Sequence, residues 1–471
     1  MSIEARGPVL AASPLGGASF WTMDRVADAL KAEALSPAPR GAHGFGRVWT
    51  DTRTLQPGDV FVALGGERFD AHDFLHDAVR AGATAVVVSR VEAAKGVGVP
   101  VYHVRDTRTA LGALARYRRR AWNGPVVGVI GTNGKISTKE LVRAALESRL
   151  EVHATTGNLN TLVGVPLTLL AIPDHADVAV VEMGTNQPGE VATLRAIVEP
   201  NIVVVTSIAE EHLEGLGDLA GVMREEMSGC DGVAVVIAPS GQPEVVSAAR
   251  RRATRVIAAG VDGGDLPVEV WSIDADGRGR LTLDDVEVSV PLFGAHNVRN
   301  ATLALAVARE VGIGTEDAAR GIARMSPPPM RSNVAPLGAA LLINDAYNSN
   351  PGSARAAIEL LVGAGVGRQR VAVLGSMLEL GGAGPALHDE IARRAVDAGI
   401  ELIAGVGEMA AALKRVGAPP ARIVVADDAE ALWAPLSSRL SRDAVILLKG
   451  SRGVRLERLV PHLTRWAQDG A

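Results

Sequence analysis

Cysteine is almost absent from this chain of 471 residues, because Cys230 is the only one. A single cysteine cannot form an internal disulfide, and it cannot build a cysteine-rich zinc site. A strong net charge is also missing, since the formal net charge is -5 and the isoelectric point is ≈ 6.1. This balance leaves no basic surface for nucleic acid, so small molecules are the expected partners.

Long apolar runs are missing as well. No stretch approaches the ~18 consecutive apolar residues from which a membrane-spanning helix is inferred. The N-terminal segment carries Glu4 and Arg6 within a mixture of Gly, Ala, Ser and Pro, and it lacks the continuous apolar core of a signal peptide. We therefore expect a cytoplasmic protein with no stable membrane insertion.

Chain-breaking residues separate three blocks of sequence. At ~100–200 residues per domain, a chain of this length favours about three domains. Asn123-Gly124-Pro125 and Pro327-Pro328-Pro329 supply the breaks, which predicts domains over residues 1–123, 124–328 and 329–471. Apolar stretches of strand length alternate with helical patterns, as is typical of βαβ units and mainly parallel sheets. The predicted fold class is α/β.

The individual elements follow from the spacing of apolar residues. The expected strands are 58–64, 85–88, 125–130, 178–181, 202–205, 340–343, 371–374 and 445–448, and the expected helices include 21–34, 74–81 and 141–146. In open α/β sheets, ligands bind beyond the carboxyl ends of the strands. Polar residues just past an apolar run are therefore the candidates for a functional site.

The segment 129–140, VIGTNGKISTKE, has the features of a phosphate-binding loop. Gly131 and Gly134 fall between an expected strand and an expected helix, where glycine lets backbone N–H groups close around phosphate oxygens. Lys135 can reach the β- and γ-phosphates of a nucleotide. The strict motif has glycine two positions before Gly131 and Ser or Thr after Lys135, whereas this chain has valine and Ile136. The alternative interpretation is a glycine-rich structural turn.

Other polar side chains also follow expected strands. Glu182 ends the strand 178–181, where a carboxylate can hold magnesium or an attacking group, and His212 follows the strand 202–205. A lone Glu or His at the end of a strand more often serves only as a hydrogen-bonding group of the fold. The presence of both residues beside a phosphate loop favours a functional site. Asn158, Asn160, Asn297 and Asn300 are candidates for binding a base edge or a peptide, with turn capping as the alternative. The run 344–351 is too densely polar for mere solvation, and the run 449–453 suits a phosphate or a carboxylate, with an ordinary basic turn as the alternative.

Taken together, these segments resemble the Mur ligases of peptidoglycan synthesis over nearly the whole chain. The similar segments are Asp51-Thr52-Arg53 and Gly58 to Phe74 in the first block, GTNGK, GNLN, GVPLTLL, VVEMG, EEHLEGLG and GAHNVRNA in the second, and INDAYNSNPGS, VLGSMLELG and LLKGSRG in the third. The DAYNSNP run discriminates between the branches of this family. It resembles the corresponding segment of the ligases that add D-alanyl-D-alanine to UDP-N-acetylmuramoyl-tripeptide. The resemblance implies an N-terminal UDP-sugar-binding domain, a central ATP-binding domain and a C-terminal Rossmann-like domain for the incoming dipeptide.

The resemblance also implies a reaction and the residues that serve it. Such an ATP-dependent carbon–nitrogen ligase uses Mg²⁺ and forms an acyl phosphate, which the amine of the dipeptide then attacks. Lys135 would neutralise the γ-phosphate, and Glu182 and His212 would hold magnesium. ATP contacts are implied for Gly131, Thr132, Asn133, Gly134, Ser137, Asn297, Asn300, Arg331 and Asp345, and substrate contacts for Thr52, Arg53, Asn158, Asn160, Tyr347, Asn348, Asn350, Lys449, Ser451 and Arg452. The implied partners are UDP-N-acetylmuramoyl-tripeptide and D-alanyl-D-alanine, and a monomer is expected.

Several residues depart from the family pattern. Ile136 replaces a hydroxyl residue that coordinates magnesium, which predicts weaker magnesium binding, and Ser137 lies roughly 100° further round the helix. A lysine that is carbamylated in the family has no counterpart, because the chain has no lysine from residue 140 to residue 413. We hypothesise that Glu226, or Glu225, supplies the missing negative charge. Thr161, Ser376 and Asn333 also differ from the residues usual in the family.

These departures leave alternatives open. A working ligase of a divergent lineage is favoured, because Lys135, Glu182 and His212 are all present. The second interpretation is a binding protein that has kept its affinity for nucleotide and UDP-sugar but has lost turnover. The third is a Mur-type ligase with another acceptor, such as a folate, and the segment 58–74 argues against it.

Overall fold

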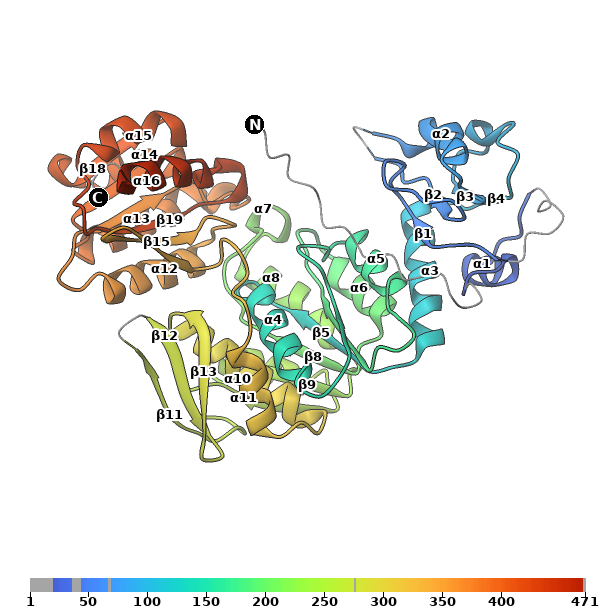
Figure 1. Cartoon of the computed structure of the whole chain (residues 1–471), viewed down its shortest axis with the longest axis horizontal. Helices are drawn as coiled ribbons and strands as arrows, with labels where there is room; N and C mark the ends of the chain where they lie inside the picture. The colour runs from blue at the N-terminus through green and yellow to red at the C-terminus, as the bar shows by residue number, and fades with distance from the viewer. Residues whose placement is uncertain (1–19, 36–43, 67–68, 275–276, 469–471) are drawn as a thin grey trace. The chain divides into compact units, whose positions relative to one another are not determined.

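The computed structural model describes residues 20–35, 44–66, 69–274 and 277–468 (Figure 1). The segment with Glu4 and Arg6, and residues 67 and 68 of the segment 58–74, lie outside these ranges. The chain forms two compact units. The first contains the described parts of Met1–Gly128 with Glu151–Gly184 and Ala192–Asn201, and the second contains Val129–Leu150, Thr185–Val191 and the described residues from Ile202 onward.

A four-stranded parallel sheet of order β1-β2-β3-β4 opens the first unit. Every residue of β2 and β3 is buried, as expected for valine-rich strands covered on both faces. The first helix is shorter than the predicted 21–34, because Lys31 adopts a left-handed conformation with φ 54° and ends it. These elements are α1 (Met23–Leu30), β1 (Val48–Trp49), β2 (Val60–Val62), α2 (Leu75–Arg80), β3 (Ala85–Val88), β4 (Val101–His103) and α3 (Thr107–Trp122).

A six-stranded sheet carries the predicted phosphate loop and has the strand order β10-β9-β8-β5-β7-β6. The pairs β6 with β7, β8 with β9 and β9 with β10 are parallel, which confirms the predicted βαβ rhythm. Its strands are β5 (Val126–Ile130), β6 (Val152–Ala154), β7 (Val178–Glu182), β8 (Ile202–Val205), β9 (Val235–Pro239) and β10 (Arg255–Ala259). The accompanying helices are α4 (Lys135–Leu146), α5 (Gly164–Leu170), α6 (Glu190–Val198), α7 (Leu213–Leu216), α8 (Leu219–Met227) and α9 (Pro243–Arg250).

A three-stranded antiparallel sheet follows, and the prediction of a mainly parallel sheet for this block did not include it. It consists of β11 (Val268–Ile273), β12 (Arg278–Leu283) and β13 (Val286–Phe293), and it is followed by α10 (Ala295–Glu310) and α11 (Thr315–Ala323). Asp284 and Asp285, with φ 54° and 60°, make the tight turn between β12 and β13. Exposed and buried residues alternate along both strands, and Figure 1 shows the sheet beside α10 and α11. That alternation was the sequence signal for a half-buried sheet.

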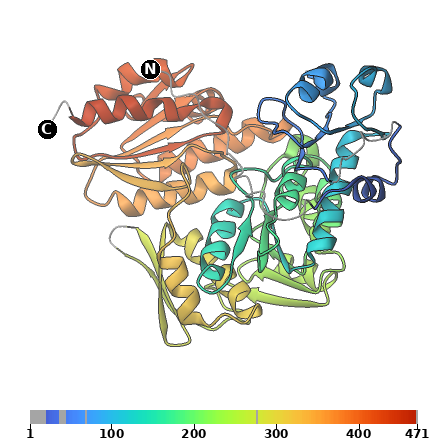
Figure 2. The same ribbon diagram turned by 45° about the vertical axis from the view of Figure 1, so that its right-hand side comes forward.

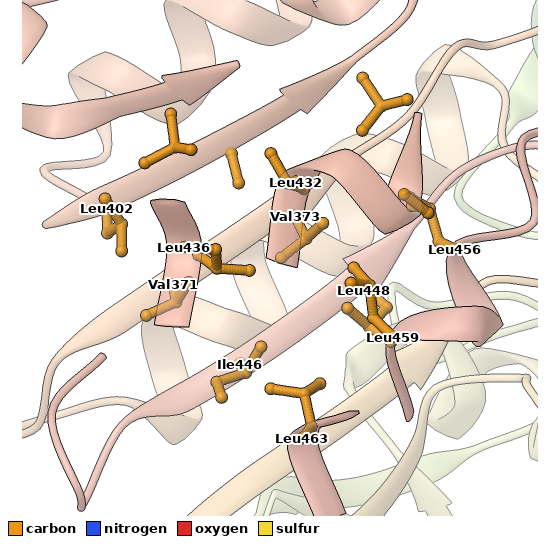
Figure 3. Close-up of a cluster of buried hydrophobic side chains, with 14 of the residues drawn as sticks. Val371, Val373, Leu402, Leu432, Leu436, Ile446, Leu448, Leu456, Leu459 and Leu463 are labelled. Atoms are coloured by element: carbon orange, nitrogen blue, oxygen red, sulfur yellow. The ribbon is translucent and has the colours of Figure 1, made fainter. Parts of the chain in front are cut away.

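The C-terminal sheet has the order β14-β15-β19-β16-β17-β18, and only β14 runs antiparallel to its neighbour. In both views its strands have helices on each face (Figures 1 and 2). On one face, leucines of α15 and α16 pack on strand residues such as Val373 and Ile446 (Figure 3). The elements are β14 (Asn333–Leu337), β15 (Ala340–Asp345), α12 (Pro351–Ala364), β16 (Arg370–Leu374), α13 (Gly384–Asp397), β17 (Leu402–Val406), α14 (Glu408–Arg415), β18 (Ile423–Ala426), α15 (Ala429–Ser437), β19 (Val445–Lys449) and α16 (Leu459–Gln468). Within the described ranges, no helix has the length and apolar character needed to cross a bilayer.

Candidate functional site

The predicted phosphate loop lies between β5 and α4, and both of its glycines are required by its geometry. Gly131 has φ 116°, and a Cβ atom there would lie 2.4 Å from Thr206 Oγ1. Gly134 has φ 83°, and a Cβ atom there would lie 2.9 Å from the amide of Asn300. No described side chain caps the N-terminus of α4. The first N–H groups of α4 therefore provide a place for an anion.

The loop is anchored to the chain that follows β8. The Thr132 N–H donates to the carbonyl of Ser207 at 2.8 Å, and the Ser207 hydroxyl donates to the carbonyl of Asn133 at 3.2 Å. The Lys135 ammonium donates to the carbonyls of Gly131 and Thr132, so its side chain folds over the loop. Its Nζ lies 3.7 Å from Oε2 of Glu211. Lys135 is thus positioned to contact an anion that the loop binds.

Glu226, on α8, contacts the same loop. The Gly131 N–H donates to Glu226 Oε2 at 2.7 Å, and Glu226 is only 2% exposed. Burial raises the pKa of the Glu226 carboxyl to about 7, although the Lys135 charge and the Gly131 N–H oppose the shift. Glu225 instead accepts hydrogen bonds from the N–H groups of Gly189 and Val191 at the start of α6. Of the two hypothesised glutamates, Glu226 is the one at the phosphate loop.

A pocket of about 400 Å³ collects many of the predicted nucleotide residues. It is lined from the loop by Asn133, Gly134 and Ser137, and from α10 by Asn297 and Asn300. The third block contributes Arg331, Asp345 and Lys449. Residues that sequence reasoning did not select also line it, namely Thr206, Ser207, Gln242, Asp262, His296 and Arg299.

Asn297 and Asn300 form a small polar network at the start of α10. Asn300 Nδ2 donates to Asn297 Oδ1 at 3.0 Å, and Asn297 Nδ2 donates to the carbonyl of Phe293 at 2.8 Å. Nε2 of His296 lies 3.1 Å from Asn297 Nδ2. Burial lowers the pKa of His296, so its neutral ring accepts from that amide. These hydrogen bonds fix the orientation of both amides, which line the pocket.

The third block supplies a buried ion pair. Lys449 Nζ lies 2.9 Å from Asp345 Oδ2, and burial lowers the pKa of Lys449 even though Asp345 opposes the shift. The Lys449 ammonium also donates to the carbonyl of Asn348, and Asp345 Oδ1 accepts the Ser332 N–H at 2.9 Å. Nearby, the Arg331 guanidinium lies 4.1 Å from the centre of the Tyr347 ring. Its Nε is buried without a hydrogen-bond partner among the described residues.

A second pocket of about 250 Å³ contains the predicted acceptor side. It is lined by Glu211, His212, Asn348, Asn350, Glu379, Ser451 and Arg452, together with Ser349, Leu378 and Gly453. Asn350 also caps α12, where its side chain accepts the Ser353 N–H. The Ser451 hydroxyl likewise bridges backbone groups of Ser349 and Leu378. These two predicted ligands therefore also stabilise the local structure.

His212 lines this pocket and has a left-handed backbone conformation with φ 52°. Its Nδ1 is hydrogen-bonded to the Glu379 carboxylate. When Nδ1 carries the proton, Nε2 is left as the acceptor, which is the arrangement that metal-binding histidines use. Glu379 was not a candidate from the sequence, although it lies in the VLGSMLELG segment.

The first unit contains the remaining predicted residues. Glu182, at the end of β7, is 1% exposed, and its Oε1 accepts from Asn160 Nδ2 at 2.8 Å. Its Oε2 is buried and has no hydrogen-bond partner within the described chain. Arg53 is exposed and paired with Asp51. Thr52 is half-buried and Asn158 is exposed.

The residues present are compatible with magnesium. Among the residues that the structure describes, no three or more His, Cys, Asp or Glu side chains are arranged so that together they could hold a metal ion. Magnesium does not need such a cluster, because it commonly keeps several waters and uses one or two carboxylates together with substrate phosphates. The unpartnered Oε2 of Glu182 suits a ligand of this kind.

Comparisons with known proteins agree with this geometry. Family models match residues 46–119 (Mur ligase family, catalytic domain), 129–308 (Mur ligase middle domain) and 330–452 (Mur ligase, glutamate ligase domain). The UDP-N-acetylmuramoyl-tripeptide--D-alanyl-D-alanine ligase of Bacillus subtilis is 33% identical over 457 residues, covering 94% of this chain and 98% of its own.

Solved structures give the same result. MurF from Acinetobacter baumannii aligns with a TM-score of 0.87 and 29% identity over 94% of this chain and 99% of its own. MurF from Thermotoga maritima in complex with ADP aligns with a TM-score of 0.78 and 27% identity over 90% and 98%. The sequence matches and the three-domain α/β architecture show that this chain belongs to the Mur ligase family.

Proposed function

We propose that the chain joins D-alanyl-D-alanine to UDP-N-acetylmuramoyl-tripeptide with consumption of ATP, and that it does so as a monomer. The observation that carries the proposal is the 400 Å³ pocket in which the phosphate loop meets Arg331, Asp345 and Lys449. The proposed domains are 1–123 for the UDP-sugar, 124–328 for ATP and 329–471 for the dipeptide. The three matched family regions and the relatives' names support this assignment.

The first step is phosphoryl transfer to the substrate carboxylate. A carboxylate oxygen attacks the γ-phosphorus of ATP, and the bond between that phosphorus and the oxygen bridging to the β-phosphate breaks. ADP is released, and the substrate carries the γ-phosphoryl group as an acyl phosphate. Because this chemistry needs positioning and charge neutralisation, Lys135 acts on the γ-phosphate and the loop residues Gly131 to Gly134 hold the chain of phosphates. Asn297 and Asn300 face the base, while Arg331 and Asp345 contact the nucleotide from the third domain.

Magnesium, when bound, would neutralise charge on the phosphoryl group in transfer. We assign Glu182 and His212 each as a protein ligand for magnesium ions, because each presents an atom suited to a metal. Ile136 supplies no hydroxyl, and Ser137 lines the nucleotide pocket nearby. Glu226 adds a carboxylate at the loop in place of the carbamylated lysine of the family. Full activity of both Glu226→Gln and Glu225→Gln would exclude that role.

The second step is attack by the dipeptide amine on the acyl carbonyl. A tetrahedral intermediate forms, and it collapses with the release of phosphate. The 250 Å³ pocket accepts the dipeptide, with Arg452 as the cation for its carboxylate and with Asn348, Asn350 and Ser451 around it. Lys449, which lines the 400 Å³ pocket, and Tyr347, whose ring centre lies 6.0 Å from the Arg452 guanidinium, are assigned to the same substrate. Thr52, Arg53, Asn158 and Asn160 are assigned to the UDP-tripeptide.

Release of ADP tests the proposal. Purified protein is mixed with ATP, excess Mg²⁺, UDP-N-acetylmuramoyl-tripeptide and D-alanyl-D-alanine, and ADP is expected only when both substrates are present. Lys135→Ala is expected to lower the rate about 100-fold, the cost of removing one transition-state donor. Nucleotide binding without ADP release would instead indicate a binding protein. ADP release with a different acceptor would indicate another Mur-type ligase.

A further inference from the structure

Glu211 lies between the phosphate loop and the third block. It follows β8, is 7% exposed, and lines the acceptor pocket. Its Oε2 is 3.7 Å from Lys135 Nζ, and its Oε1 accepts from Asn348 Nδ2 at 3.4 Å. One carboxylate thus contacts the lysine of the phosphate loop and an amide of the acceptor pocket.

The contact with Asn348 leads into a buried chain of polar groups. The carbonyl of Asn348 accepts from Lys449 Nζ, and Lys449 is paired with Asp345. Asp345 in turn accepts the N–H of Ser332, just before β14. The charge of Glu211 also opposes the lowering of the Lys449 pKa. A change at Glu211 is therefore expected to affect Asn348, Lys449 and Asp345 through these contacts.

The contact with Lys135 is electrostatic rather than a hydrogen bond. The distance of 3.7 Å exceeds hydrogen-bond length, and Glu211 Oε2 has no hydrogen-bond partner within the described chain. Because the carboxylate is buried, its charge is poorly screened and acts strongly on nearby groups. A phosphate that approaches Lys135 competes with this carboxylate for the same cation and is repelled by it.

We propose that Glu211 is a positioning residue that couples the occupancy of the phosphate loop to the Asn348 side of the acceptor pocket. This inference rests on the proposed function and adds to it. Before nucleotide binds, Lys135 holds the carboxylate by its charge. A phosphate at Lys135 replaces that partner and leaves Glu211 with its contacts in the acceptor pocket, where its Oε1 accepts from Asn348 and lies 3.9 Å from His212 Nε2. ATP binding thereby completes the acceptor pocket.

Two substitutions separate the two contacts. Glu211→Gln removes the charge and keeps an acceptor for Asn348, whereas Glu211→Ala removes both. Both variants are expected to bind ADP about five- to tenfold more tightly in calorimetry, because a buried negative charge near the phosphates is gone. Only the Ala variant is expected to raise the KM for D-alanyl-D-alanine, by about fivefold, through the loss of the Asn348 contact.

Glu210 provides a matched control. It is the preceding glutamate and also faces the third block, with Oε2 3.7 Å from an Arg355 nitrogen, but the structure gives it no contact with the phosphate loop. Glu210→Gln is expected to leave both ADP affinity and the dipeptide KM within about twofold of the starting protein, because a half-buried ion pair that solvent still reaches contributes little.

In an Asn348→Ala background, Glu211→Ala is expected to tighten ADP binding without a further rise in the KM for D-alanyl-D-alanine.

The outcomes discriminate between the proposals. ADP binding that is unchanged or weaker in Glu211→Gln, or equally tightened in Glu210→Gln, overturns the coupling. A KM that rises equally in the Gln and Ala variants overturns the role of Asn348. ADP binding is measured without ligation, so tightened ADP binding in a protein that fails to ligate the dipeptide overturns the proposed reaction and supports the contact with Lys135.

Discussion

The backbone N–H of Gly131 donates to Oε2 of Glu226 at 2.7 Å, which places a buried carboxylate against the first glycine of the phosphate loop. Burial keeps water from Glu226, and the Lys135 charge and the Gly131 N–H recover only part of the lost solvation. The result is a carboxyl group whose pKa is raised to about 7. Its charge state therefore changes within the physiological range of pH.

Glu226→Gln is expected to change the pH dependence of stability. The folded protein holds the Glu226 proton more tightly than the unfolded chain, so the group stabilises the fold at low pH and loses this contribution as pH rises from about 4.5 to about 7. The loss is at most about 3 kcal/mol, from about 1.36 kcal/mol per pKa unit. Urea midpoints at pH 5, 6.5 and 8 should show the native protein losing stability relative to the variant. A constant difference across this range would contradict the raised pKa.

Ile136→Thr is expected to lower the Mg²⁺ concentration needed for half-maximal ADP release. A hydroxyl after the loop lysine is the group that this position lacks, and one added ligand is worth about 1 kcal/mol, or about fivefold. Ile136→Val is the matched control, because valine has the shape of threonine without the hydroxyl. An equal shift in both variants would mean that side-chain size, rather than the hydroxyl, was responsible.

Glu182→Gln is expected to raise the Mg²⁺ requirement about tenfold or more, in the range seen when groups around a metal are changed. Stability should hardly change, because Gln can still accept from Asn160 and because Oε2 has no hydrogen-bond partner to lose within the described chain. Mg²⁺ titrations of ADP release and thermal midpoints measure the two effects. Glu147→Gln, on an exposed part of the chain after α4, serves as the control. Unfolding of the Glu182 variant would assign Glu182 a structural role instead.

Asp345→Asn is expected to destabilise the protein by about 3–5 kcal/mol, because it leaves the buried Lys449 cation without its partner. Adding Lys449→Met should restore most of the lost stability, since a buried apolar side chain needs no counterion. Urea denaturation of the two single variants and the double variant measures this coupling. Additive losses would show that the two side chains do not stabilise each other.

Much of the fold could be predicted from the apolar spacing. The expected strands 85–88 and 202–205 are β3 and β8 within their predicted limits, and the loop between β5 and α4 lies where its glycines indicated. The antiparallel sheet β11-β12-β13 was missed, because its alternating residues lie within a block whose rhythm is otherwise βαβ. Short alternating runs are weak signals beside longer apolar strands.

The candidate site was only partly predictable. Asp345 and Lys449 were both placed at strand ends, but their ion pair depends on the register of β15 against β19, in which the two residues are direct neighbours. Glu211 and Glu379 were not singled out from the segments that contain them. The end of a predicted strand indicates at which edge of the sheet a residue lies. Predicting its contact with another residue also requires the position of the strand or loop that carries that residue.

The sequence by itself determined the α/β class and the resemblance to Mur ligases, and it predicted the phosphate loop and the three blocks, because these depend on local spacing and on the residue types that a turn or an anion site requires. Only the tertiary structure decided which of two adjacent glutamates, Glu225 or Glu226, contacts the loop, and that Glu211 lies beside Lys135. Adjacent helical residues differ by about 100° in direction, and packing alone selects the one that faces the site.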